Sequence, residues 1–104
     1  MIRYHIIILI MALLYKPPFR KFVKKQNRPF QLAIEDEVER INQDHAVGEV
    51  KKGDLSGFRV YKFKVKGMEY LIAYKAQDKD IVFYMIDTHE NFYNALKRYI
   101  REVE

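Results

Sequence analysis

The hydrophobic pattern of this chain changes from a helical period to a strand period near its middle, and that change limits the possible folds more than any other feature. Over residues 29–44 the large apolar side chains recur every three or four positions, which is the period of an amphipathic helix. Over residues 58–66 the side chains alternate between two faces, which is the period of a strand. The helical stripe is Phe30, Ile34, Val38 and Ile41, and the two strand faces are Val60, Lys62, Lys64 and Lys66 against Arg59, Tyr61, Phe63 and Val65. Helices in one part of the chain and strands in another predict an α+β fold.

An uninterrupted apolar run covers residues 6–14, close to the start of the chain. A membrane-spanning helix needs roughly 20 residues, so this run is too short to cross a bilayer. Its isoleucines favour a buried strand. Met11 is an alternative start of the protein, in which case residues 1–10 are an upstream extension and the strand is shorter.

Prolines divide the next part of the chain into a helical hairpin. Pro17 and Pro18 end the first strand and suit the first turn of a helix. The apolar side of that helix carries Phe19, Phe22 and Val23. The segment 27–29 (Asn-Arg-Pro) interrupts it, and the second helix follows over residues 29–44. Residues 45–57 contain three glycines and are predicted to be an irregular loop.

Three strands and a final helix are predicted after this loop. The strands cover residues 58–66, 68–75 and 81–87, and short turns between them make an antiparallel meander. Asp87 or Thr88 is expected to cap the helix, because Asp87 and Glu90 have the spacing of a capping box. The buried stripe of this helix is Phe92, Leu96, Tyr99 or Ile100, and Val103. Residues 1–104 are therefore predicted to form one domain with an N-terminal strand, a helical hairpin, a meander and a C-terminal helix.

The charge of the chain suits a phosphate-bearing partner or an acidic protein. The formal net charge is +5, and cations are concentrated in residues 1–34 and 51–66, whereas residues 35–44 are acidic. The chain has no cysteine, which favours an intracellular, cytoplasmic location and excludes a cysteine-based zinc site. Its three histidines have no metal-ligand spacing, so no metal or other cofactor is predicted.

Three segments, in this order, resemble the RelE/ParE superfamily of toxins from bacterial type II toxin–antitoxin systems. They are residues 48–62 (GEVKKGDLSGFRVYK), 70–74 (YLIAY) and 88–98 (THENFYNALKR). The resemblance covers about residues 11–100 and implies a cognate antitoxin that wraps the toxin in a hetero-oligomer. It also implies one of two activities. Some members are mRNA interferases, many of them acting on the ribosome, and others poison gyrase without nuclease chemistry.

Candidate site residues follow from the chemistry of RNA cleavage. Attack by the 2′-hydroxyl needs a base, cations that stabilise charge on phosphorus, and an acid for the leaving oxygen. His89 is the acid/base candidate because histidine can hold or release a proton near neutral pH, and the family places a His or Arg there. Tyr93 lies one helical turn later, where the resemblance implies contact with the scissile nucleotide. The predicted catalytic set is His89, Tyr93, Arg59 and Lys64, and the predicted RNA-binding set is Lys51, Lys52, Lys62 and Lys66.

Each of these residues also has an ordinary structural explanation. His89 can simply end a helix in solvent, Tyr93 can pack in the core, and an alternating lysine stripe is also what a solvated strand face looks like. Only one histidine falls in the predicted site, which leaves gyrase poisoning, or an inactive relative, as alternatives to an mRNA interferase. Of these, the mRNA interferase, an endoribonuclease that needs no metal, is the primary hypothesis.

Overall fold

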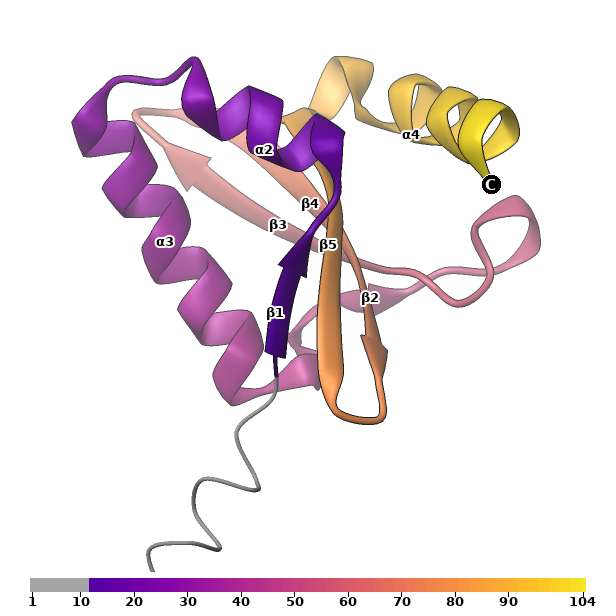
Figure 1. Cartoon of the computed structure of the whole chain (residues 1–104). Coiled ribbons are helices and arrows are strands. Elements are labelled where there is room, and N and C mark those ends of the chain that lie inside the picture. The colour runs from indigo at the N-terminus through magenta and orange to yellow at the C-terminus, as the bar shows by residue number, and fades with distance from the viewer. Residues whose placement is uncertain (1–11) are drawn as a thin grey trace, which may run out of the picture.

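The computed structural model describes residues 12–104, and Figure 1 shows the arrangement of their helices and strands. In chain order these are β1 (Ala12–Tyr15), α2 (Pro17–Lys24), α3 (Arg28–Gln43), β2 (Glu49–Val50), β3 (Arg59–Val65), β4 (Met68–Gln77), β5 (Asp80–Thr88) and α4 (His89–Val103). Two short 3-10 turns flank β2, at His45–Val47 and Gly53–Leu55.

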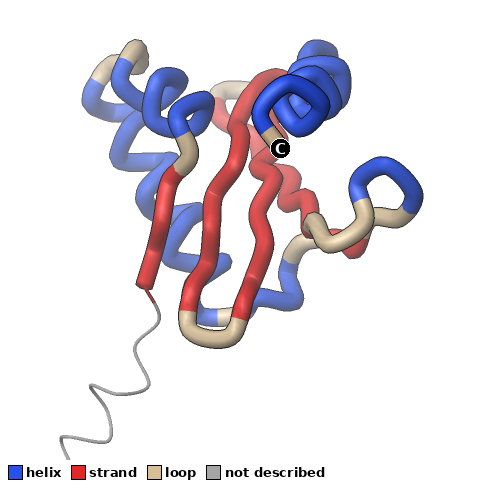
Figure 2. The backbone as a smooth tube through the Cα atoms, turned by 45° about the vertical axis from the view of Figure 1, so that its right-hand side comes forward, coloured by secondary structure: helices blue, strands red, loops and turns tan. Residues whose placement is uncertain are grey.

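The strands form one twisted sheet in the order β1-β5-β4-β3-β2 (Figure 2). β3, β4 and β5 pair antiparallel, and β1 joins the edge of the sheet parallel to β5. The predicted α+β fold with a helical hairpin, a meander and a C-terminal helix is therefore confirmed. Of the N-terminal strand predicted for residues 6–14, only the last three positions fall within β1, and the others lie outside the described residues.

Helices cover both faces of the sheet. α2 and α3 pack on one face, where they bury an aromatic-rich cluster that includes Phe19, Ile34, Tyr74 and Phe83. α4 packs on the other face through Phe92 and Leu96, which are fully buried. The strand residues alternate between these two clusters, as the period of two predicts. The sheet thus has a face covered by α2 and α3 and a face covered by α4.

One β-bulge changes this alternation in β5. Ala73 of β4 lies opposite Met85 and the next residue, Tyr74, lies opposite Phe83, so Tyr84 is the extra residue. As a result Tyr84 and Met85 both pack on the face covered by α4. The Tyr84 ring meets Phe58 edge-on, with the ring centroids 4.7 Å apart.

The structure corrects three details of the sequence-based prediction. The segment 45–57 is not wholly irregular, because Glu49 and Val50 pair with β3 and add a fifth strand to the sheet. No capping box forms at α4: the Asp87 carboxylate accepts a hydrogen bond from the adjacent Thr88 N–H at 2.7 Å, and the Thr88 side chain makes no cap bond. Val103 was predicted to belong to the buried stripe of α4, but it is 61% exposed, and residues 101–104 are all exposed.

Candidate functional site

A hollow of about 430 Å³ lies between β2, β3 and the start of α4, on the face of the sheet that α4 covers. Val60 and Leu71 form part of its apolar lining. The ionisable residues that line it are Glu49, Lys51, Tyr61, Lys62, His89 and Tyr93. Of these, Tyr61 has its side chain on the opposite face of the sheet, where its hydroxyl donates to the Glu37 carboxylate at 2.6 Å. Segments far apart in the sequence thus bring an imidazole, a carboxylate and two ammonium groups to one concave surface.

The geometry of α4 explains how His89 and Tyr93 reach the hollow together. Thr88 ends β5 and is the N-cap of α4, so His89 is the first residue of the helix. Tyr93 follows one turn later on the same side. The buried Phe92 fixes the rotation of the helix against the sheet, and its ring centroid lies 5.0 Å from that of Tyr93.

Lys62 reaches the hollow because of the pleat of β3. Val60 is buried on the face covered by α4, and Lys62 lies two residues later on that face with an exposed side chain. Leu71, the partner of Lys62 on β4, is also part of the lining. Lys62 is therefore placed beside the hollow by a strand that is paired on both sides, with β2 and β4, which is a favourable support for a functional side chain.

Glu49 and Lys51 form an ion pair at the edge of the hollow. The Lys51 Nζ lies 2.5 Å from the Glu49 Oε1 and 5.3 Å from the centroid of the Tyr93 ring. The hydrogen bond from Lys51 lowers the pKa of the Glu49 carboxyl, and the charges of Lys51 and Lys62 lower it further. The same hydrogen bond raises the pKa of Lys51, with a smaller contribution from Tyr93. The pair therefore stays ionised at neutral pH, and its ammonium group lies beside the Tyr93 ring.

The structure brings four of the predicted site residues together and leaves four elsewhere. His89, Tyr93, Lys51 and Lys62 line the hollow, whereas Arg59, Lys64, Lys52 and Lys66 do not. Lys64 is exposed on the same face of β3 as Lys62, one pleat further from the hollow. Lys52 is exposed after β2, and Lys66 lies in the β3–β4 turn with a φ of 52°.

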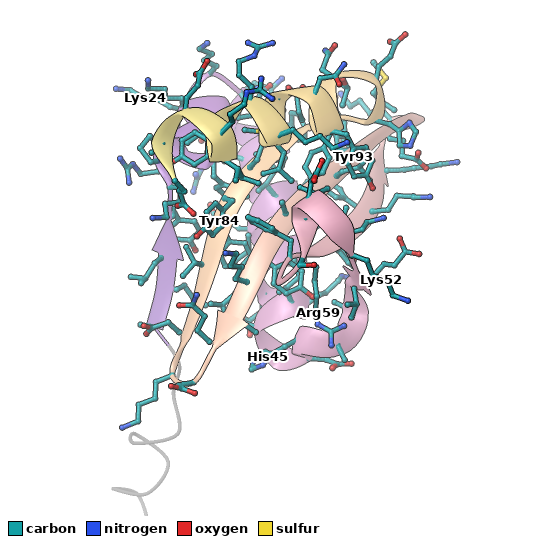
Figure 3. The ribbon with its side chains drawn as sticks, turned by 90° about the vertical axis from the view of Figure 1, so that its right-hand side faces the viewer. Lys24, His45, Lys52, Arg59, Tyr84 and Tyr93 are labelled. Carbon is teal, nitrogen blue, oxygen red and sulfur yellow. The ribbon has the colours of Figure 1, made fainter. Side chains whose placement is uncertain are left out.

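Arg59 lies on the opposite face of the sheet from the hollow. Its Nη1 donates a hydrogen bond to the backbone oxygen of Gly48 at 2.8 Å. Figure 3 shows Arg59 low in the view, near His45, well away from Tyr93 on α4. The alternation of β3 already placed Arg59 opposite the lysine stripe, and the structure gives it a backbone partner.

Sequence reasoning did not select Glu49 and Tyr61, and of these two only Glu49 has its side chain on the face of the sheet that carries the hollow. Its signal was the alternation of Glu49 and Lys51, which puts both side chains on one side of an extended segment. In an irregular loop this spacing does not put two side chains on one side, and residues 45–57 were predicted to be such a loop. Pairing of Glu49 with Val60 supplies the missing strand.

The part of the chain that the structure describes contains neither a metal-ligand cluster nor a membrane-spanning helix. Among residues 12–104, no three His, Cys, Asp or Glu side chains come together in a way that could hold a metal ion. Over the same residues, no helix has the length and apolar character needed to cross a bilayer.

A second hollow, of about 450 Å³, lies on the other face of the sheet between β1, α2 and α3. Its lining is mostly apolar and includes Leu13, Phe19, Val23, Ile34 and Val38. Charged side chains stand at its rim, with Arg20 and Lys24 from α2 and Glu35 and Glu39 from α3. This hollow offers buried apolar surface rather than acid/base chemistry.

Comparison with known families identifies the class of protein to which this fold and site belong. The model of a family described as ParE-like toxin of type II bacterial toxin–antitoxin system matches residues 13–97. The chain therefore belongs to the ParE-like toxin family. No curated protein sequence matches the chain.

Solved structures of the Escherichia coli toxin RelE share the fold. A double arginine-to-alanine variant of RelE in the free state has a TM-score of 0.65 at 12% identity, covering 90% of this chain and 99% of RelE. RelE in the intact RelBE toxin–antitoxin complex has a TM-score of 0.59 at 14% identity, with 75% and 95% coverage. The isolated RelE toxin gives 0.58 at 15% identity, with 85% and 97% coverage. At these identities the likeness establishes a RelE-like fold and leaves the activity to the site residues.

Proposed function

We propose that this toxin is a metal-independent mRNA interferase whose active site is the hollow between β2, β3 and α4. The observation that carries the proposal is the grouping of His89 and Glu49 with Lys51 and Lys62 around one concave surface. These are the group types that cleavage by the 2′-hydroxyl requires: a base, an acid and cations for the phosphate. The net charge of +5 suits an RNA substrate.

In the proposed reaction Glu49 is the base, His89 is the acid, and the two lysines stabilise the phosphate charge. The Glu49 carboxylate takes the proton of the 2′-hydroxyl, and the 2′-oxygen attacks the adjacent phosphorus. Lys62 and Lys51 stabilise the negative charge that builds on the phosphoryl oxygens. His89, in its protonated form, donates a proton to the 5′-oxygen as the P–O bond breaks. The products are a 2′,3′-cyclic phosphate and a free 5′-hydroxyl, so no metal and no external water are needed for the cleavage step.

Tyr93 is proposed to orient the scissile nucleotide. Its ring is half-buried in the lining and lies beside the Lys51 ammonium group. An aromatic face at such a position can stack with any of the four bases, at about 1–3 kcal/mol per base. Lys64 and Lys52 lie outside the hollow and would contact neighbouring phosphates of a longer RNA.

Gyrase poisoning is the second candidate function, because the matching family is described as ParE-like. This function requires no acid/base pair. The decisive experiment is a short pulse of toxin expression without antitoxin, followed by primer extension on abundant mRNAs. New 5′ ends inside coding regions, absent with His89→Ala and Glu49→Gln, support the interferase. Growth arrest with intact mRNA and induced DNA damage supports gyrase poisoning and contradicts the interferase.

The apolar hollow between β1, α2 and α3 is our proposed contact for the cognate antitoxin. Toxins of type II systems are held by such a partner, and RelE has been solved in a complex with its antitoxin. An apolar segment of the antitoxin would bury its side chains against Val23 and Ile34. The rim, with cations on α2 and anions on α3, would fix its direction.

A further inference from the structure

The segment that carries Glu49 and Lys51 is held in place by two residues from the opposite face of the sheet. The Gly48 N–H donates to the Tyr74 hydroxyl at 2.9 Å, and that hydroxyl donates to the His45 backbone oxygen at 2.5 Å. Arg59 donates to the Gly48 oxygen at 2.8 Å. Both polar groups of the Gly48 backbone are therefore bound, one residue before Glu49.

The fit around Tyr74 leaves the segment little freedom. Tyr74 is fully buried, and its ring packs beside Phe83 with the centroids 6.1 Å apart. A Cβ atom at Gly48 would lie 2.6 Å from the Tyr74 hydroxyl oxygen, closer than real contacts allow. The φ of Gly48 is −81°, so close approach to Tyr74, not backbone conformation, explains the glycine. The chain passes directly over the tyrosine hydroxyl.

The other supports of Glu49 are few. β2 has only two residues, and Glu49 and Val50 pair only with Val60 and Arg59. The Glu49 side chain is 74% exposed, and Lys51 is its ion-pair partner. Without the contacts to Tyr74 and Arg59, the position of the carboxylate would depend on a two-residue edge strand and one further backbone hydrogen bond, from the Lys51 N–H to the Phe58 oxygen at 3.0 Å. A sheet edge with so few bonds frays easily.

We propose that Tyr74 and Arg59 are positioning residues, which hold Glu49 at the hollow by binding the backbone of Gly48 and His45 from the opposite face of the sheet. This inference rests on the proposed function of the hollow, because it assigns a role to residues that never touch the RNA. It also gives Arg59 a role that fits its place: Arg59 supports the base and does not bind the phosphate.

Tyr74→Phe tests the proposal, because it keeps the buried ring and removes only the hydroxyl. For cleavage of a short RNA we expect kcat to fall roughly tenfold while KM stays within about twofold, since a misplaced base affects the chemical step more than binding. Arg59→Met should have a similar effect, and Arg59→Lys should restore part of the rate because its ammonium can still donate to the Gly48 oxygen. The matched control is Tyr84→Phe, which removes another tyrosine hydroxyl, bonded to Glu104, far from this segment.

A second measurement needs no catalysis. Lys51 from its own segment and Lys62 from β3 act on the charge of Glu49, and His89 and Tyr93 from α4 line the same hollow. NMR titration of the Glu49 carboxyl in the wild-type toxin should give a pKa below the ordinary glutamate value. In Tyr74→Phe and Arg59→Met this pKa should rise, because the carboxylate is no longer held beside these cations, and in Tyr84→Phe it should not change.

The two measurements separate the possible failures. If Tyr74→Phe and Arg59→Met lower the melting temperature but leave both kcat and the Glu49 titration unchanged, the contacts only stabilise the fold and the inference is wrong. If the titration shifts as expected while the wild-type toxin cleaves no RNA, positioning of Glu49 is supported and the proposed interferase activity is wrong.

Discussion

The two hollows of this protein have nearly the same volume and opposite chemistry. The hollow at β2, β3 and α4 holds a carboxylate, an imidazole and two ammonium groups, whereas the hollow at β1, α2 and α3 is lined mainly by aliphatic and aromatic side chains. Their volumes are about 430 and 450 Å³. Size therefore does not distinguish the two hollows, and our assignment of RNA cleavage to the first rests on its side chains.

The difference also fits the two functions that we propose for the two faces of the sheet. Each face is covered only in part: α2 and α3 leave an apolar gap beside the edge strand β1, and α4 leaves a charged gap beside β2. Apolar surface favours association with a protein segment, and clustered charge favours a phosphate. We expect substitutions in one hollow to leave the function of the other intact.

The largest expected effect concerns the imidazole. His89→Ala should reduce RNA cleavage by about 10²–10⁴-fold, because it removes the proton donor for the leaving oxygen. Cleavage is measured on a purified RNA or by primer extension after pulse expression, and antitoxin affinity should not change. His45→Ala is the matched control, since only the backbone of His45 takes part in the contact with Tyr74. A His89→Ala protein that is folded and fully active would exclude His89 from the mechanism.

The next effect concerns the lysine on β3. Lys62→Gln should lower kcat/KM for RNA by roughly 10–100-fold, because one cation near the developing phosphate charge is lost. Lys79→Gln, in the exposed β4–β5 turn, removes the same charge far from the hollow and should have little effect. Equal losses in the two variants would indicate that net charge alone matters, and the distinction between the hollows would then fail.

A smaller effect, on antitoxin binding, is expected in the apolar hollow. Val23→Glu should weaken antitoxin binding by about tenfold, because it places a charge where an apolar side chain should be buried. Cleavage of RNA by the free toxin should not change. Titration calorimetry with the antitoxin measures this, and Leu32→Glu, at an exposed leucine of α3 that does not line the hollow, is the control. Unchanged antitoxin affinity in a folded Val23→Glu protein would place the contact elsewhere.

The smallest expected effect is a shift in pH dependence. Lys51 holds the pKa of Glu49 below its ordinary value. Glu49 therefore stays ionised, and able to act as a base, until the pH falls through this lowered pKa. Lys51→Met should let the pKa of Glu49 rise, and the acid limb of the kcat/KM profile should move to higher pH. Lys52→Met, whose side chain lies outside the hollow, should leave the limb where it is. A limb that does not move in Lys51→Met would rule out Glu49 as the base.

The predictable parts of this protein are those that depend on neighbours in the sequence. The stripe of Ile34, Val38 and Ile41 defines α3, and the alternation of β3 is enough to separate Lys62 from Arg59. The spacing of His89 and Tyr93 also places both on one side of α4, since residues one turn apart always share a helix face. The helical hairpin, the meander and the faces on which Lys62, His89 and Tyr93 lie follow from such local rules.

Only the tertiary structure decided the rest. Glu49 and His89 line one hollow because β2 pairs with β3 and α4 packs over the same face of the sheet, and neither arrangement leaves a local pattern in the sequence. The Gly48 N–H donates to the Tyr74 hydroxyl, and the Gly48 oxygen accepts from Arg59, because the chain before β2 crosses the edge of the sheet. Local periodicity tells which face a side chain occupies, but contacts between distant segments form only when the whole chain buries its core, so the position of the proposed base is a property of the complete fold.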